Sequence, residues 1–241
     1  MRISIHQPNF LPWMGLFNRI ALSNKFIFFD HVQAMGGKSW LSRNKILVSG
    51  KDYWITMPVR KSGRLGQSIN EVEINYDVNF KKKHLKTFEV NYNKSKYFNE
   101  IFPHLESIYN KNHTHISDFN KEFIILISNK LGLNTSFEAS SEINSKDERL
   151  SNLSGNELVK EICISMKATQ YISGEGCLDF IKPEDFKRNG IKFYFQNFKH
   201  PFYSQIKSSK FIENLSIIDV IFNLGLKKTA YLIQENNLKE F

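Results

Sequence analysis

The chain contains little cysteine. Only Cys163 and Cys177 occur among its 241 residues, and neither has a metal-type partner at short spacing. Two thiols form no disulfide framework of the kind on which small secreted domains depend. Cys163 lies beside an expected apolar helical stripe, so we expect it to be structural. The cysteine pattern indicates neither a disulfide scaffold nor a thiolate metal centre.

Long apolar runs and a leader segment are also missing. No stretch approaches the roughly 20 apolar residues that a membrane span requires. The first two residues, Met1 and Arg2, lead directly into an expected core strand rather than into a signal peptide. We therefore expect a cytoplasmic protein with no transmembrane segment.

The motifs of several common enzyme classes are absent as well. The sequence has no Walker loop, no GxGxxG, no GxSxG and no cluster of metal ligands. His113 and His115 stand too close together and too isolated to indicate a metal site. We therefore expect no metal.

Basic residues, in contrast, are plentiful. The chain has 33 Lys and Arg against 24 Asp and Glu, which gives a formal net charge of +9. A basic surface favours anionic partners such as nucleotide sugars, coenzyme phosphates or an acidic acyl carrier. Apart from the run at 81–83, the charge is spread along the chain rather than gathered into a nucleic-acid arm. We expect no binding of DNA.

The stretch 3–15 organises the rest of the chain. Ile3 and Ile5 alternate with polar neighbours and predict a short strand, which Pro8 ends. Apolar positions at helical spacing predict a helix after residue 12. The loop between them belongs at the carboxyl edge of a sheet, where open α/β sheets bind ligands. Its polar residues are His6, Gln7 and Asn9.

The wider pattern predicts an α/β fold. An apolar run at 25–30 predicts a second strand, so strand, helix and strand indicate a parallel βαβ unit. Further strands are expected at 53–59, 168–173 and 191–195. We predict a mainly parallel sheet flanked by helices, in a single domain spanning 1–241.

A mainly helical section is expected around 78–131, as a lobe of that domain. His84 lies there on an apolar stripe, which is typical of a packing histidine. The basic loop at 60–66 is either a hairpin tip or an anion-binding lid. Residues 138–153, rich in Ser, Asn and charge, are predicted to be a loop. Cap-like residues are expected to begin helices at Ser117, at Ser154 with Glu157, and at Ser216 with Asp219.

Several blocks of the sequence resemble the WbqC-like family, and together they cover almost the whole chain in the expected order. They are His6–Gly15, Asp30–Gln33, Arg43-Asn44, Tyr171–Gly174 with Gly176, His200–Tyr203 with Gln205, Leu215–Asp219, and Phe222-Asn223 with Gly225. The family is associated with bacterial O-antigen and polysaccharide gene clusters. The resemblance implies a role in modifying an activated sugar.

The candidate catalytic residues are His6 and Asp30. Histidine titrates near neutrality and His6 ends a strand, so it is the best general base. Asp30 would orient the imidazole or bind a substrate amine. The blocks at 6–9, 30–33 and 173–176 each follow a predicted strand and are expected to share one pocket. The residues expected to bind substrate are Gln7, Asn9, Trp13, Gln33, Arg43, Asn44, Ser173, Gly174, Gly176, His200, Tyr203 and Gln205.

The resemblance favours transfer of an acyl or aminoacyl group to the amine of a nucleotide-linked amino sugar. Backbone N–H groups near Gly174 and Gly176 would stabilise the oxyanion. The acyl donor would be carried on coenzyme A, a carrier protein or tRNA. An amine nucleophile needs no covalent enzyme intermediate, so Cys177 is expected to be dispensable rather than a nucleophile.

Two other functions stay open. The strand, His-Pro loop, Gly15 and helix are similar to those of pantothenate-synthetase-like nucleotidyltransferases, which suggests an ATP-dependent adenylate-forming ligase or a nucleotidyltransferase. No second histidine follows Gly15, so ATP is the less expected cofactor. A non-catalytic nucleotide-sugar binding module is the third hypothesis.

Overall fold

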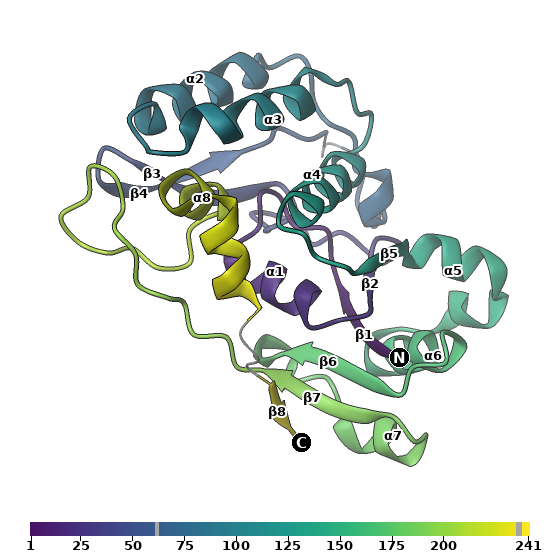
Figure 1. The fold of residues 1–241 in the computed structure, drawn as a ribbon. Coiled ribbons are helices and arrows are strands. Elements are labelled where there is room, and N and C mark those ends of the chain that lie inside the picture. The colour runs from purple at the N-terminus through teal and green to yellow at the C-terminus, as the bar shows by residue number, and fades with distance from the viewer. Residues whose placement is uncertain (61–62, 235–237) are drawn as a thin grey trace.

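A mostly parallel sheet forms the centre of the protein (Figure 1). The computed structural model describes residues 1–60, 63–234 and 238–241, and only the backbone of Glu175. The strand order is β5-β2-β1-β6-β7-β8. The first five strands in that order run parallel, and β8 pairs antiparallel with β7. The strands are β1 (Arg2–His6), β2 (Lys25–Phe28), β5 (Ser136–Ala139), β6 (Gln170–Gly174), β7 (Lys192–Gln196) and β8 (Leu238–Glu240). The predicted α/β class is confirmed.

The order of the strands reverses between β1 and β6. From β1 the chain moves to β2 and then to β5, and afterwards it returns to β6 and β7 on the other side of β1. In open α/β sheets such a switch point is where ligands bind, at the carboxyl ends of the strands. The sheet therefore has one preferred position for a site, next to the end of β1.

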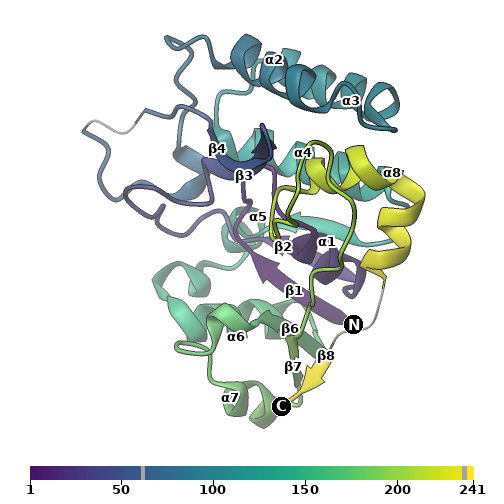
Figure 2. The ribbon, with the colours of Figure 1, turned by 90° about the vertical axis from the view of Figure 1, so that its left-hand side faces the viewer.

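Helices cover both faces of the sheet (Figures 1 and 2). One face carries α1 (Met14–Ala21) and α8 (Ile217–Ile233). The other carries α5 (Ser140–Lys146), α6 (Gly155–Ser165) and α7 (Pro183–Arg188). Both faces are consequently apolar, as expected for parallel strands.

Alternation along β1 separates its side chains between the two faces. Ile3 and Ile5 join the smaller core beneath α6 and α7. Ser4 faces the other way and hydrogen-bonds Ser23 just after α1, at 2.8 Å between the two hydroxyl oxygens. His6, two residues after Ser4, therefore lies on the α1 face.

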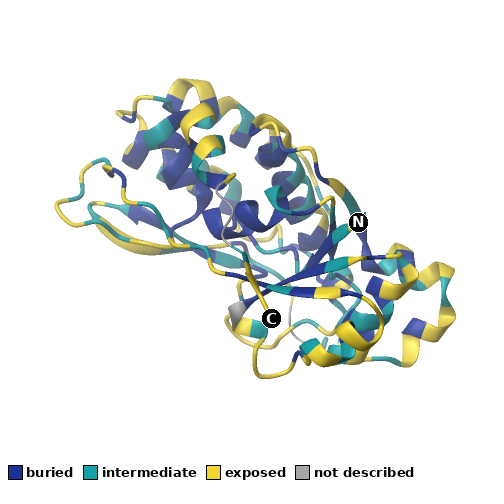
Figure 3. Cartoon of the chain, turned by 60° about the horizontal axis from the view of Figure 1, so that its bottom comes forward, coloured by how far each residue is buried: buried dark blue, intermediate teal, exposed yellow. Residues whose placement is uncertain are grey.

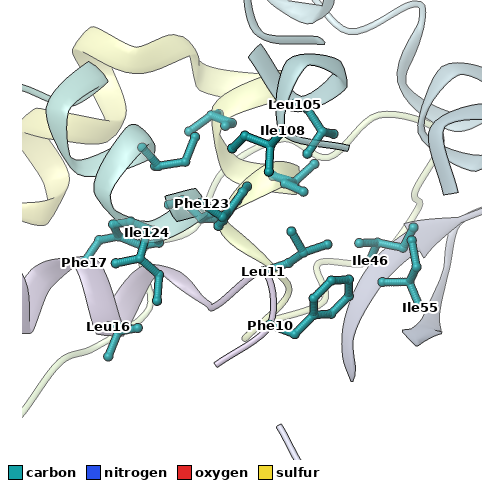
Figure 4. Packing of buried hydrophobic residues seen from close by; sticks show 14 of the residues in the cluster. Phe10, Leu11, Leu16, Phe17, Ile46, Ile55, Leu105, Ile108, Phe123 and Ile124 are labelled. Carbon is teal, nitrogen blue, oxygen red and sulfur yellow. The ribbon is translucent and has the colours of Figure 1, made fainter. Parts of the chain in front are cut away.

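The larger core lies between the sheet and a helical section. That section contains α2 (Phe80–Tyr92), α3 (Phe98–Asn110) and α4 (Ile116–Lys130), within the predicted range 78–131. A separate antiparallel hairpin, β3 (Arg43–Val48) and β4 (Lys51–Thr56), packs beneath α2. Figure 4 shows side chains from α1, α3, α4 and the hairpin meeting around Phe10 and Leu11. Buried positions accordingly follow the inner sides of these helices (Figure 3).

One local prediction was wrong. Residues 138–153, predicted as a loop, contain the end of β5, all of α5 and the 3-10 helix Glu148–Asn152. The carboxylate of Asp30 accepts a 2.9 Å hydrogen bond from the Ser141 backbone N–H at the start of α5. A partner 111 residues away in the sequence thus fixes the start of α5. The predicted strand at 53–59 is confirmed as β4, which pairs with β3 and lies outside the main sheet.

The predicted caps had mixed outcomes. Ser216 accepts a hydrogen bond from the N–H of Ile218 and begins α8. Ser154 stands at the N-cap of α6 without a side-chain cap bond. Ser117 is buried inside α4, which begins at Ile116. Asp219 is also buried and binds other side chains, so it is no cap.

His84 is the packing histidine that the apolar stripe predicts. Its Nε2 donates to the carbonyl oxygen of Thr56 at 3.1 Å, so the other nitrogen of the neutral ring accepts from the hydroxyl of Tyr109 at 3.1 Å. Burial lowers the pKa of His84 to about 4, although the bond to Thr56 opposes this shift. The ring is therefore neutral in the folded protein at pH 7.

We predict that His84 makes the protein sensitive to acid. Its pKa is about 4 in the folded state against 6.5 in the unfolded chain, so its stabilisation is complete above pH 6.5 and is lost as the pH falls toward 4. Between pH 7.5 and 5 the loss should be about 2 kcal/mol in the free energy of unfolding. Urea unfolding at both pH values measures it. His84→Gln should show a correspondingly smaller pH dependence, and an unchanged one would contradict the assignment.

Candidate functional site

The strands β1 and β6 pair only at their beginnings. Their ladder joins Arg2–Ser4 to Gln170–Ile172. Each strand continues for two residues, and there it stays paired with its outer neighbour: His6 with Phe28 in β2, and Gly174 with Gln196 in β7. The sheet thus opens between the ends of β1 and β6, at the switch point.

A cavity of about 400 Å³ lies beside this opening. Its volume is in the range of small-molecule sites. Two tryptophans, three asparagines and a histidine make it both aromatic and rich in amide groups. The lining residues are His6, Asn9, Trp13, Trp40, Asn44 and Asn214. Four of these six were expected to belong to the site.

His6 presents a neutral imidazole to the cavity. Its Nδ1 lies 2.7 Å from the carbonyl oxygen of Gln7, so this nitrogen carries the proton and donates it. No hydrogen bond from the described residues engages Nε2, which keeps its lone pair. Burial and the positive charge of Arg19 lower the pKa of His6 to about 4, against the effect of the bond to Gln7. His6 is therefore an uncharged hydrogen-bond acceptor at pH 7.

Trp13 owes its position to Gly15. A Cβ atom on Gly15 would lie 2.3 Å from the indole ring of Trp13, which no side chain could tolerate. The indole also meets the edge of Phe198, with ring centroids 5.6 Å apart. Gly15 therefore makes room for an aromatic wall of the cavity, a packing role rather than a phosphate-binding one.

The loop after β1 is held by two buried asparagines. The side-chain amide of Asn44 donates to the carbonyl oxygens of Phe10 at 3.2 Å and Leu11 at 2.8 Å. The amide of Asn120 donates to the carbonyl of Pro8 at 2.8 Å. Asn44 lines the cavity, but its amide is occupied by this backbone and its oxygen accepts from the N–H of Lys45. Its described bonds therefore assign it to holding the loop.

Asp30 makes no hydrogen bond to His6 in the part of the chain that the structure describes. It is fully buried, and it accepts hydrogen bonds from the hydroxyls of Ser140 and Ser141 as well as from the N–H of Ser141. Lys121 pairs with it at 3.2 Å. The ring of His6 is oriented by Gln7 instead. The structure thus uses Asp30 to fix the start of α5, and it does not support the expected orienting role.

Gln33 and Arg43 are not among the residues that line the His6 cavity. Gln33 is exposed and borders a separate cavity of about 310 Å³ with the loops 34–42 and 64–67. The guanidinium of Arg43 lies 3.9 Å from the ring centroid of Trp54 on the hairpin. Gln7 contributes its carbonyl to His6. The expected blocks are thus only partly brought together.

The basic loop at 60–66 borders that second cavity. Lys61 and Ser62 lie outside the described residues. Arg64 and Arg60 both pair with Glu73, at 2.8 and 3.9 Å respectively. These ion pairs fit the hairpin-tip reading better than the anion-lid reading.

The block at 200–205 mostly faces inward. Tyr203 donates its hydroxyl to the carboxylate of Asp219 at 2.7 Å, and Gln205 donates to the same carboxylate at 3.1 Å. His200 hydrogen-bonds the carbonyl of Pro201, and burial lowers its pKa. These residues shape the loop that carries Asn214 to the cavity. The polar groups of Tyr203 and Gln205 are engaged there, whereas Nε2 of His200 is buried without a partner among the described residues.

Ser173 and Gly174, the last two residues of β6, face opposite sides of the sheet. Gly174 faces α1, where a Cβ atom would lie 2.5 Å from Nη2 of Arg19. Ser173, one residue earlier, points to the other face and its hydroxyl contacts the Gly174 carbonyl at 3.4 Å. Gly176 is exposed in the 3-10 helix Glu175–Cys177. Only Gly174 of this block contacts the opening.

Sequence reasoning missed Arg19, Trp40, Asn120 and Asn214. Arg19 carried a usable signal, because it is the one charged residue in the otherwise uncharged helix Met14–Ala21. Trp40, half exposed beside a glycine pair, was a weaker one. Asn120 lies 112 residues from the carbonyl of Pro8 that it binds, so no local pattern could reveal it.

The fold and the site together define an α/β protein with a ligand-sized cavity at the switch point of a parallel sheet. The chain belongs to the WbqC-like protein family, whose model matches residues 7–231. The resemblance read from the separate blocks is thereby confirmed.

A protein of Mycobacterium tuberculosis, named uncharacterized protein Rv1507c, is 32% identical to this chain over 236 residues. The alignment covers 96% of this chain and 97% of that protein. No solved structure matches the chain. Among the described residues, no helix has both the length and the apolar character needed to cross a membrane.

We predict that Asn44 and Asn9 differ in what they support. Asn44→Ala leaves two buried carbonyls without donors, so it should lower the free energy of unfolding by about 2–4 kcal/mol. Asn9→Ala, on the half-buried cavity wall, should change stability by less than about 0.5 kcal/mol. Denaturant unfolding of both variants provides the comparison. Equal stabilities of the two variants would contradict the role of Asn44 in holding the loop.

Proposed function

We propose that this protein transfers an acyl or aminoacyl group to the amine of a nucleotide-linked amino sugar, in the assembly of O-antigen or capsule. The observation that carries the proposal is the neutral imidazole of His6 in a cavity that Trp13 and Trp40 also line, with an Nε2 atom that no described residue engages. Aromatic faces with a few well-placed polar groups suit a sugar ring. The family's association with polysaccharide gene clusters supports the choice of substrate.

In the proposed reaction the sugar amine attacks the carbonyl carbon of the acyl donor. A C–N bond forms, and the nitrogen becomes acidic as it gains positive charge. Nε2 of His6 then takes the proton from nitrogen. Collapse of the tetrahedral intermediate breaks the bond to the donor, and the proton leaves with the departing thiol or hydroxyl. A weakly basic histidine suffices, because it acts after the nitrogen has become acidic.

The donor is proposed to be an acyl group on coenzyme A, a carrier protein or tRNA. All three are anionic, which matches the net charge of +9. A surface groove of about 610 Å³ beside α2 is lined by Lys82, Lys83 and Lys86. It is larger than the His6 cavity, and its lining includes neither a histidine nor a carboxylate. We therefore assign this groove to docking of the anionic donor, and the His6 cavity to the transfer reaction.

A non-catalytic nucleotide-sugar binding module is the second candidate. The observation that favours it is the pKa of His6 at about 4, since a ring so weakly basic also suits a simple hydrogen-bond acceptor. Ligand binding without turnover would identify this function. Turnover only with ATP would instead identify an adenylate-forming or nucleotidyl-transferring enzyme.

We predict that His6→Ala lowers turnover by about 10²- to 10⁴-fold, the usual contribution of a general base. The assay follows acylation of UDP-, GDP- or dTDP-amino sugars by mass spectrometry, with each donor class and with or without ATP. The melting temperature should change little, because His6 is only half-buried. His115→Ala, a histidine away from the cavity, is the matched control. Full activity of His6→Ala would rule out the base.

We also predict that Cys177 is dispensable. It is half-buried against the smaller core and follows the end of β6. Because the amine attacks directly, Cys177→Ser should retain at least half of the wild-type rate, and iodoacetamide should not inhibit. An acyl thioester trapped on Cys177 and detected by mass spectrometry would instead establish a two-step transfer.

A further inference from the structure

Arg19 is a buried charge with an unusual set of partners. The residue is only 6% exposed and lies in the last turn of α1, among the buried residues of that helix. Its Nε donates to the side-chain oxygen of Gln196 at 3.0 Å, and that amide in turn donates to the carbonyl of Gly15. Among the described residues, no carboxylate lies within ion-pair distance of the guanidinium. A buried cation without a counter-ion is costly, so its retention calls for an explanation.

The guanidinium lies at the opening between β1 and β6. Gly174 ends β6, and its missing side chain leaves the space that Nη2 of Arg19 occupies. Gln196, which holds Nε, ends the next strand, β7. On the other side of the opening, the charge of Arg19 is close enough to act on His6 at the end of β1. Three neighbouring strand ends thus surround one fixed cation.

The chemistry of this arrangement suits an oxyanion. Arginine stays charged at neutral pH even though burial lowers the pKa of Arg19. Gln196 occupies one of its five N–H donors, and the described residues accept hydrogen bonds from none of the other four. Such a fork matches two oxygens of a phosphate group. Its position at the switch point is where open α/β sheets bind ligands.

We propose that Arg19, held in place by Gln196, binds a phosphate group of the ligand at the opening between β1 and β6. The phosphate is the diphosphate of the nucleotide-linked sugar, an assignment that rests on the proposed function. In such a substrate the diphosphate is bonded directly to the sugar, so a cation and a base on two sides of one opening can engage neighbouring parts of it. Arg19 is then a binding residue and His6 the acid–base residue.

Binding of a phosphate group to Arg19 would also raise the pKa of His6. The charge of Arg19 is one of the two causes that lower the pKa of this histidine. An anion on the guanidinium offsets that charge, so the bound phosphate makes His6 a stronger base. Substrate binding would therefore prepare the proton acceptor.

The test uses the full chain, with inorganic pyrophosphate and UDP as ligands and calorimetry as the readout. Wild type should bind both, and Arg19→Met should bind each at least tenfold more weakly. Arg19→Lys, which keeps the charge, should recover part of the affinity and covers the case in which Arg19→Met does not fold. Arg188→Met, at an exposed arginine, should bind like wild type.

A second readout is the pKa of His6, from NMR titration of the imidazole. Pyrophosphate should raise it in wild type, and Arg19→Met should raise it without ligand. Absence of pyrophosphate binding, or equal binding by Arg19→Met, would overturn the proposal. Intact pyrophosphate binding without acyl transfer would instead count against the transferase alone.

Discussion

The site depends on the hydrogen bonds that two buried asparagine amides make to the loop after β1. Asn44 and Asn120 donate to the carbonyls of Pro8, Phe10 and Leu11, all in a loop whose apolar side chains lie inside the larger core. Loops normally run over the surface because buried backbone groups need partners. These amides supply the partners, so the loop can enter the core and still place His6 at one end and Trp13 at the other. The aromatic packing around Phe10 and Leu11 then fixes the loop against α3, α4 and the hairpin (Figure 4).

The buried carboxylate of Asp219 links the helical section to the loop that carries Asn214 to the cavity. The carboxylate of Asp219 accepts hydrogen bonds from Tyr92 in α2 and from Tyr203 and Gln205 in the loop before α8. Burial raises the pKa of Asp219, while these donors stabilise its charged form and oppose the shift. Tyr92 also accepts from the N–H of Leu47 in β3. Through this cluster two of the blocks that resemble the family, His200–Tyr203 with Gln205 and Leu215–Asp219, are joined to α2 and to β3. The described hydrogen bonds of Tyr203, Gln205 and Asp219 thus give these residues a structural role.

Local patterns predicted the parts of the fold whose causes are local. The alternation of Ile3 and Ile5, the apolar run at 25–30 and the spacing after Trp13 describe β1, β2 and α1 correctly. They also place His6 at the end of a strand, as the structure has it. The failures have distant causes: Asp30 stabilises the start of α5 from 110 residues away, and Asp219 serves a tertiary cluster rather than a cap. Arg19 escaped notice because a helix pattern counts it as surface, whereas the glycine at 174 that makes room for it belongs to another strand.

At the opening between β1 and β6, His6 and Arg19 act on each other electrostatically. A solvated histidine would titrate near neutrality, but burial and, after it, the charge of Arg19 lower the pKa of His6, so the ring stays neutral and avoids repulsion between two cations. A lone buried arginine would be a costly charge, but Gln196 and the polar opening partly replace its hydration. Each of four elements contributes one residue: Arg19 comes from α1, His6 from β1, Gly174 from β6 and Gln196 from β7. His6 and Arg19 meet because the strand order reverses between β1 and β6. The topology of the sheet therefore brings together a neutral imidazole and a guanidinium that has no counter-ion among the described residues. The phosphate group proposed to bind there would supply that counter-charge.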